Sequence, residues 1–117
     1  MAKHNDIGEN GEELATNFLL SNGYSVLEKN YRFDRAEIDI IAKNDKLLIF
    51  VEVKTRTTDF YGNPEDFLSI DQQKRITKAA QHFIEENNWQ NEIRFDIIAI
   101  NHHNELHHIK DAFFIID

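Results

Sequence analysis

The sequence predicts an α/β protein in which helices flank a mixed β-sheet. Two segments with apolar residues at helical spacing alternate with five short stretches of β-forming residues, in the order αβββαββ. The first three strands follow one another through short connections, which favours an antiparallel meander, and the second helix crosses over to a further strand. At 117 residues the chain is long enough to bury a core, so we expect a single domain over residues 1–117.

The first predicted helix begins near Asp6, because Asp6 and Glu9 have the spacing of a capping box. Its apolar positions recur at the spacing of one helix face and are Ile7, Leu14, Ala15, Phe18 and Leu19. Gly23 follows as a natural helix stop. Residues 24–33 then form the first predicted strand.

A predicted hairpin of two strands, residues 36–43 and 47–56, comes next, with a two-residue turn at Asn44-Asp45. A polar loop over residues 55–67 follows it. Two aromatic residues in this loop either anchor it or stack on nucleic-acid bases: Phe60 and Tyr61.

The second predicted helix spans residues 71–87, and its buried face carries Ile76, Ala79, Ala80, Phe83 and Ile84. Residues 93–100 and 106–116 complete the sheet as its last two strands. Between these strands begins a histidine-rich tract, residues 102–108. Its histidines have no fixed metal-site spacing, so the tract favours a turn over a zinc site.

Composition excludes several classes of protein. Without cysteine the chain forms neither a disulfide framework nor a thiolate metal site. The polar first residues carry no signal-peptide pattern, and no apolar run is long enough to cross a bilayer, so we expect a cytoplasmic protein without membrane contact. The net charge of −8 argues against tight nucleic-acid binding, but ten of the thirteen Lys and Arg residues lie within residues 29–78, which leaves weak or localised binding open.

Charged residues interrupt the predicted hairpin at regular positions. Side chains alternate between the faces of a strand, so Glu37 and Asp39 share one face, as do Glu52 and Lys54 on the next strand. In the register that the turn sets, Glu37 falls opposite Glu52. Asp39 falls opposite Phe50, with Glu52 as its diagonal neighbour at about 7–8 Å. The apolar residues of the first strand of the hairpin point to the other face: Ile38, Ile40 and Ala42.

Carboxylates gathered in this way repel one another unless a cation lies between them. Oxygen ligands at this density suit a hard divalent ion, Mg²⁺ or Mn²⁺, which polarises a phosphodiester and lowers the pKa of an attacking water. Lys54 would position that water or stabilise charge on the phosphate. The set therefore indicates a site for phosphodiester cleavage. The alternative is an ordinary solvated face, on which Glu and Lys alternate for solubility.

A further acid, Glu12, lies at the edge of the apolar face of the first helix, beside Leu19 on a helical wheel. From there it can lean over the sheet and join the carboxylates. We expect the carboxylates of Asp39 and Glu52 to lie close enough to share one ion, with Glu12 approaching the same point.

Four segments resemble the YraN family of small bacterial proteins, over nearly the whole chain: NGEELATNFLLSNGYSVLEKNYR, EIDIIA, FVEVKTR and RFDIIAI. That family is similar to the PD-(D/E)xK nucleases, and archaeal Holliday-junction resolvases carry similar motifs. The resemblance implies a restriction-endonuclease-like αβββαβ core and a Mg²⁺-dependent endodeoxyribonuclease that acts on DNA at branched or structured sites. Since resolvase-like proteins dimerise, it also allows a homodimer.

The same resemblance implies roles for individual residues. Asp39 is the first metal-binding acid and Glu52 the second. Lys54 is the motif lysine, and Glu12 takes the place of the helix-borne acid. Glu37 would orient the site as a supporting residue.

Basic residues outside this set are candidates for phosphate contacts. Lys74 lies beside Arg75 in a basic patch of the second helix, and we select it as a nucleic-acid-binding residue; a solvated helix face is the alternative. Arg32 and Arg35 precede the second strand and would flank a nucleic-acid cleft. Arg56 would support the site by holding the loop or a phosphate.

Two other functions remain open. A non-catalytic nucleic-acid- or protein-binding module that retains the nuclease fold is favoured by the net charge of −8, whereas the acid-acid-lysine set opposes it. A structural protein, with the hairpin face covered by a partner or a second copy, would need no catalytic site at all.

Overall fold

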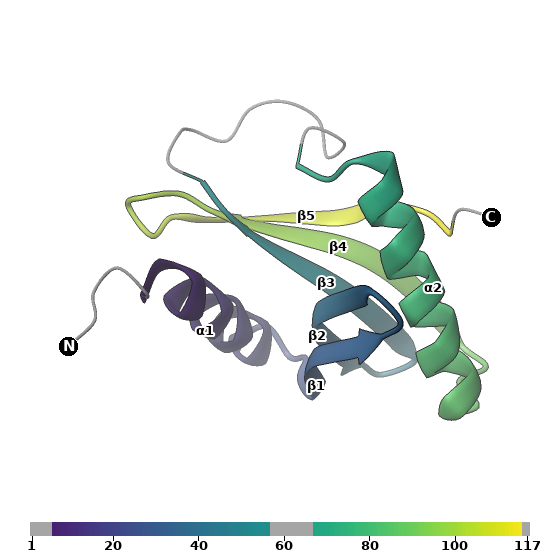
Figure 1. Ribbon diagram of the computed structural model, residues 1–117. Helices are drawn as coiled ribbons and strands as arrows, with labels where there is room; N and C mark the ends of the chain where they lie inside the picture. The colour runs from purple at the N-terminus through teal and green to yellow at the C-terminus, as the bar shows by residue number, and fades with distance from the viewer. Residues whose placement is uncertain (1–5, 57–66, 116–117) are drawn as a thin grey trace.

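A five-stranded mixed sheet forms the centre of the structure, a computed structural model that describes residues 6–56 and 67–115 (Figure 1). Its strands, in spatial order, are β1 (Ser25–Phe33), β2 (Ala36–Asn44), β3 (Leu47–Thr55), β4 (Glu92–Ile100) and β5 (Leu106–Phe113). The β3–β4 pair is parallel and the other pairs are antiparallel. Helix α1 (Asp6–Ser21) precedes the sheet, and α2 (Ile70–Glu86) makes the crossover from β3 to β4. The α/β class and the αβββαβ order are confirmed, with β5 added at one edge.

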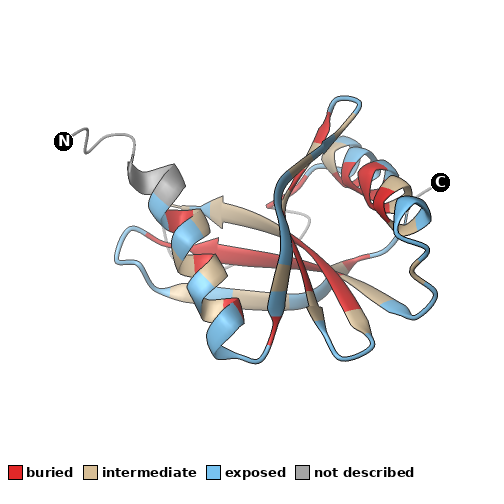
Figure 2. Cartoon of the chain, turned by 90° about the horizontal axis from the view of Figure 1, so that it is seen from below, coloured by how far each residue is buried: buried red, intermediate tan, exposed pale blue. Residues whose placement is uncertain are grey.

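The two helices lie on different sides of the sheet, so its central strands are buried on both faces (Figures 1 and 2). Helix α2 contributes the apolar face that the sequence predicted, and its Ala79 and Ala80 share a core cluster with Phe50 of β3. Helix α1 contributes Ala15 and Leu19 to a second cluster on the other face. Each face of the sheet therefore has a core of its own.

The β2–β3 turn lies one residue further along the chain than the sequence predicted. Asn44 pairs with Leu47, so the two turn residues are Asp45 and Lys46 rather than Asn44 and Asp45. Asp45 has a φ of 55°, a left-handed conformation that Asp and Asn adopt more readily than other non-glycine residues. A turn at residues 44–45 and a turn at residues 45–46 both contain an Asn or Asp residue, so the residue types did not distinguish the two positions.

This difference moves the cross-strand pairs of the hairpin by two residues. Phe50 pairs with Ile41 instead of Asp39, and it is buried in the cluster beneath α2. The predicted opposition of Glu37 and Glu52 is therefore wrong. The observed register brings Asp39 to the level of Glu52 instead.

Strand β2 changes face at Asp39. Ile40 packs in the cluster beneath α1, whereas Ile38, two residues away, packs in the cluster beneath α2. Regular alternation would put both on one face, so the predicted orientation is wrong at this point. Strand β1 is irregular at the same level, because Asn30 has a left-handed φ of 56° and the register passes over the Asn30–Asp39 pair. The local distortion removes Asp39 from the ordinary alternation of the strand.

Gly11 allows α1 to approach β3 closely. A Cβ on residue 11 would lie 2.7 Å from Cγ2 of Thr55, nearer than two side-chain carbons normally pack. Glu12 is the next residue, half-buried at the margin of the same helix. The missing side chain of Gly11 therefore sets how near Glu12 comes to the sheet.

A buried charge cluster joins β4 and β5 to the segment after α1. The fully buried Asp96 carboxylate accepts hydrogen bonds from Arg94 at 2.8 and 2.7 Å, from His108 at 2.8 Å and from the Asp111 backbone N–H at 3.0 Å. Arg94 also donates to the Tyr24 hydroxyl at 3.0 Å. Burial alone would raise the pKa of Asp96, but these hydrogen bonds hold it below its ordinary value. Asp96 is a satisfied structural acid.

The histidine-rich tract begins in the β4–β5 turn, as predicted. Asn101 organises this turn, since its Oδ1 accepts from the backbone N–H groups of His103 and Glu105, both at 2.9 Å. The predicted loop aromatics Phe60 and Tyr61 lie outside the described residues. Within residues 6–56 and 67–115, no helix combines the length and apolar content needed to span a membrane.

We expect Gly11→Ala to cost more stability in the wild type than in a Thr55→Ser background. Alanine favours a helix by about 1 kcal/mol over glycine, but its Cβ would press on the Thr55 methyl group, and overpacking of this kind costs about 1–3 kcal/mol. Thr55→Ser removes that methyl group. Urea unfolding of the wild type, the two single variants and the double variant should give a coupling free energy of about 1–2 kcal/mol between residues 11 and 55. Additive effects would contradict the close approach of helix and strand.

Candidate functional site

The Asp39 carboxylate takes the place of a backbone partner where β2 and β3 separate. Regular pairing of the two strands ends at Ile40 and Val51. Beyond that pair, the backbone N–H of Val53 donates to Oδ2 of Asp39 at 2.8 Å. This bond satisfies a donor of β3 and fixes the Asp39 side chain between the strands.

Asp39 and Glu52 form a half-buried carboxyl pair. The side chain of Glu52, which is 16% exposed, is hydrogen bonded to that of Asp39. Burial, and then the charge of Asp39, raises the pKa of Glu52 to about 8. Burial also raises the pKa of Asp39, and the charge of Glu37 adds to this effect. Both acids therefore hold a proton more tightly than a solvated carboxyl group does.

Lys54 approaches this pair from the same strand. Its Nζ lies 3.9 Å from Oε2 of Glu52, and its side chain is 26% exposed. The charge of Lys54 lowers the pKa of both acids without offsetting their burial. The other oxygen of Glu52, Oε1, is buried, and no donor of the described residues reaches it. A buried acceptor without a donor is costly, and a cation at this point would remove the cost.

Two more acids, Glu12 of α1 and Glu37 of β2, interact electrostatically with Asp39. Partial burial raises the pKa of Glu12, and the charges of Asp39 and Glu37 raise it further. Asn30 of β1 bridges the two glutamates: with Nδ2 turned toward them, it donates to Oε1 of Glu12 at 3.3 Å and to Oε2 of Glu37 at 3.0 Å. No motif or spacing in the sequence indicates Asn30, which has a left-handed backbone conformation at this position.

The structure gathers the predicted acids without forming a complete set of metal ligands. Across residues 6–56 and 67–115, no three His, Asp or Glu side chains are arranged to hold one ion. Asp39 and Glu52 are neighbours where the regular pairing of β2 and β3 ends. Glu12 is held at the side by Asn30. The metal-binding roles of the three acids stay predictions.

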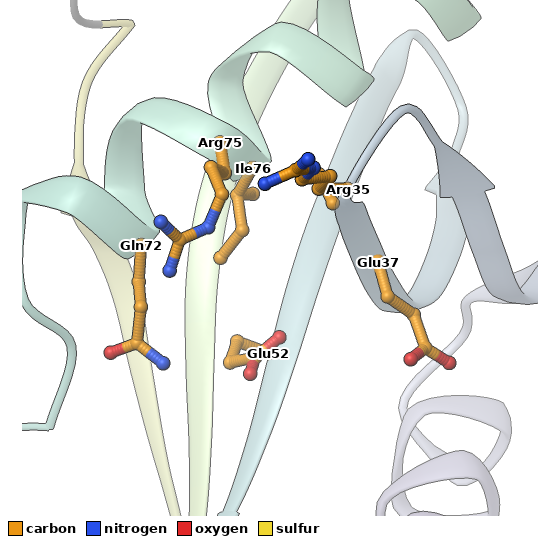
Figure 3. A pocket seen from close by; sticks show the side chains of 7 residues that line it. Arg35, Glu37, Glu52, Gln72, Arg75 and Ile76 are labelled. Carbon is orange, nitrogen blue, oxygen red and sulfur yellow. The ribbon is translucent and has the colours of Figure 1, made fainter.

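A pocket beside Glu52 collects polar side chains from the β1–β2 turn, from the strands and from α2. Those side chains are Arg35, Glu37, Glu52, Gln72 and Arg75 (Figure 3). Lys74, the residue that sequence analysis selected on this helix, is exposed and lies outside the pocket lining. Its neighbour Arg75 is the basic residue of α2 that reaches the pocket. The sequence alone does not show which side of α2 faces Glu52, so it could not distinguish Arg75 from Lys74.

The other basic candidates have neighbours of their own. Nη2 of Arg32 lies 3.6 Å from Oε1 of Glu37, and the arginine side chain is 78% exposed. The guanidinium carbon of Arg56 lies 4.6 Å from the ring centre of Phe67, just before α2. Arg32 therefore partly neutralises Glu37, and Arg56 ties the end of β3 to the segment before α2. Their roles toward phosphate stay predictions.

The sequence of the chain matches one family of proteins. A sequence model of the Uncharacterised protein family UPF0102 matches residues 11–100. The chain is 49% identical to the UPF0102 protein of Christiangramia forsetii, and the alignment covers 97% of this chain and 98% of that protein. It is 44% identical to the UPF0102 protein of Flavobacterium psychrophilum and 43% identical to that of Clostridium perfringens, with the same two coverages.

Among solved structures, the chain is similar to Pyrococcus furiosus SfsA in complex with Ca²⁺. The TM-score is 0.37 and the sequence identity 16%, over 96% of this chain and 65% of the SfsA chain. This similarity is distant.

We expect Glu52→Gln to stabilise the protein at alkaline pH when divalent ions are removed. The pKa of Glu52 rises from 4.5 in the unfolded chain to about 8 in the folded protein, so the folded state binds the proton more tightly. Stability from protonated Glu52 is fully present below pH 4.5 and is lost as the pH rises through about 8. Glutamine does not ionise. In urea unfolding with EDTA, the free energy of unfolding of Glu52→Gln, relative to that of the wild type, should increase by a few kcal/mol from about pH 5 to about pH 9.

Glu85→Gln is the matched control, because Glu85 is an exposed glutamate near the end of α2. The free energy of unfolding of Glu85→Gln should change with pH in the same way as that of the wild type. A Glu52→Gln profile parallel to that of the wild type would contradict the raised pKa.

Proposed function

The chain belongs to the UPF0102 family, in agreement with the YraN resemblance, and from the site that its residues build we propose that it is a metal-dependent nuclease. It would hydrolyse phosphodiester bonds of DNA with Mg²⁺ or Mn²⁺. The observation that carries this proposal is the pairing of the Asp39 and Glu52 carboxyl groups where β2 and β3 separate, with Lys54 3.9 Å from Glu52.

The donor set of the pair fits a hard divalent ion. Both side chains offer carboxylate oxygens, which Mg²⁺ and Mn²⁺ prefer over nitrogen or sulfur ligands. Oε1 of Glu52 is buried without a donor, so one ligand atom is already desolvated. Asp39 and Glu52 would hold the ion, and Glu12 would contribute from α1 by exchanging its contact with Asn30. Such an ion needs few protein ligands, because Mg²⁺ keeps several waters and takes others from substrate phosphate.

When bound, the ion would polarise the phosphodiester and lower the pKa of an attacking water. Lys54 supplies a point charge beside the pair, where it stabilises negative charge on the phosphate or positions the water. Val53 holds Asp39 through its backbone N–H, so the first acid does not need the ion to keep its position. Asp39 is therefore in position before a metal or a substrate binds.

The distribution of charge supports DNA as the substrate in spite of the net charge of −8. Arg35 and Arg75 line the pocket beside Glu52, and Arg32 lies against Glu37 at the same margin. A polyanion would meet positive groups here, although most of the surface would repel it. Similarity to the junction resolvases makes branched or structured DNA the class of substrate to test first, with a cytoplasmic homodimer as the matching form of the protein.

The proposal predicts metal-dependent cleavage that the acid variants lose. Linear, flapped and four-way-junction DNA would be incubated with the protein and Mg²⁺ or Mn²⁺, and products would be resolved on denaturing gels. Asp39→Ala and Glu52→Ala should each lower the rate by at least about 100-fold, and Lys54→Ala by about 10²–10³-fold, since these groups act on the reacting phosphate. Glu85→Ala, at an exposed acid on α2, should cut at the wild-type rate.

Absence of cleavage of all three DNAs by the wild type with either metal would overturn the nuclease proposal. Binding without cleavage would support the non-catalytic module instead. Cleavage by Lys54→Ala at the wild-type rate would remove Lys54 from the mechanism while leaving the acids in place.

A further inference from the structure

The pocket beside Glu52 has a basic end that the cleavage site itself does not use. Figure 3 shows the guanidinium groups of Arg35 and Arg75 on the same side of the pocket, above Glu52. Arg35 comes from the β1–β2 turn and Arg75 from α2, so two segments distant in the sequence bring like charges together. The carboxylate of Glu37 points away from them in the same view.

Neither arginine is neutralised by another described residue. Both side chains are exposed, and within residues 6–56 and 67–115 neither makes an ion pair or a side-chain hydrogen bond. Arg32 and Arg94, by contrast, each face a carboxylate, Glu37 and Asp96 respectively. Two unpaired guanidinium groups on one side of a pocket repel each other, and an anion between them would reverse that repulsion.

Gln72 adds an oriented donor to the same pocket. Its Oε1 accepts from the backbone N–H of Ser69 at 3.0 Å, as part of the capping box that begins α2. The side-chain NH₂ group therefore points the other way, and Figure 3 shows its nitrogen turned toward the pocket. Gln72 also lies in the first turn of α2, where the helix dipole favours a negative charge.

We infer that Arg35, Arg75 and Gln72 bind one phosphate of a DNA strand, next to the phosphate that is held at the carboxyl pair. This inference rests on the proposed function and adds a binding subsite to it. Guanidinium groups suit phosphate because their planar set of donors matches its oxygens. The subsite would set which bond of the strand reaches Asp39 and Glu52.

The arrangement of charges in the pocket favours a DNA strand over inorganic phosphate as the ligand. Donors lie at one end of the pocket, and the acids Glu52 and Glu37 line the rest. A small multiply charged anion would be attracted by the donors but repelled by the acids. A DNA strand carries its charge as separate single charges, so one phosphate can occupy the basic end while the next lies over the metal site.

The test is DNA binding in EDTA, where cleavage cannot contribute. Fluorescence anisotropy would follow a labelled four-way junction and a labelled duplex over a range of salt concentrations. Arg35→Ala and Arg75→Ala should each raise the Kd about 5- to 10-fold and lower the slope of log K against log salt by about one. Lys78→Ala is the matched control, because Lys78 is an exposed basic residue of α2 outside the pocket, and its Kd should stay within about twofold of the wild type.

Three results would overturn the subsite. They are arginine variants that bind like Lys78→Ala, a wild type that binds neither DNA at low salt, and inorganic phosphate that displaces DNA more strongly than chloride at equal ionic strength. The last result would assign the pocket to free phosphate. Circular dichroism would check that each variant is folded, which the exposure of both arginines leads us to expect.

The same proteins separate this inference from the nuclease proposal. Cleavage with Mn²⁺ but no dependence of binding on the arginines would remove the subsite and leave the nuclease. Dependence of binding on the arginines without cleavage would remove the nuclease and leave a DNA-binding pocket.

Discussion

The hydrogen bond from the Val53 backbone to the Asp39 carboxylate is the contact on which the rest of the site depends. It lies where β2 and β3 stop pairing, so a side chain replaces a backbone acceptor and is fixed by the sheet itself. Glu52, one residue before Val53, is thereby brought against Asp39, and Lys54 follows one residue after it. The two acids therefore need no loop to position them, because the divergence of two strands does so.

The protein contains two kinds of acid that are removed from solvent, and they differ in their hydrogen-bond donors. Asp96 is surrounded by donors from Arg94, His108 and Asp111, and its pKa is held low. Asp39 and Glu52 are half-buried beside each other, Oε1 of Glu52 has no donor among the described residues, and the pKa of Glu52 rises to about 8. The first arrangement joins strands. The second is a pair of acids with raised pKa values, and under the proposed function a divalent ion would replace its proton.

Much of the fold could be predicted because hydrophobic periodicity specifies it. The order of helices and strands, the buried face of α2 and the turn at the histidine tract all follow from local patterns. The hairpin register could not be predicted, since Asn44 and Asp45 both suit a turn. The change of face at Asp39 was also beyond the sequence, because it accompanies a left-handed Asn30 on the neighbouring strand. The acids were found by residue type and motif, while their contacts, and the choice of Arg75 over Lys74, depended on tertiary structure.

Calorimetric titration with Mn²⁺ near pH 7, in buffers of different ionisation enthalpy, would show whether Asp39 and Glu52 bind a divalent ion. With the pKa of Glu52 at about 8, binding of one ion to the pair should release about one proton, and this release should diminish near pH 9. Asp39→Asn should abolish both the binding and the proton release, while Glu85→Gln should change neither. Absence of Mn²⁺ binding to the wild type, or binding that is unchanged in Asp39→Asn, would contradict the assignment of Asp39 and Glu52 as a metal site.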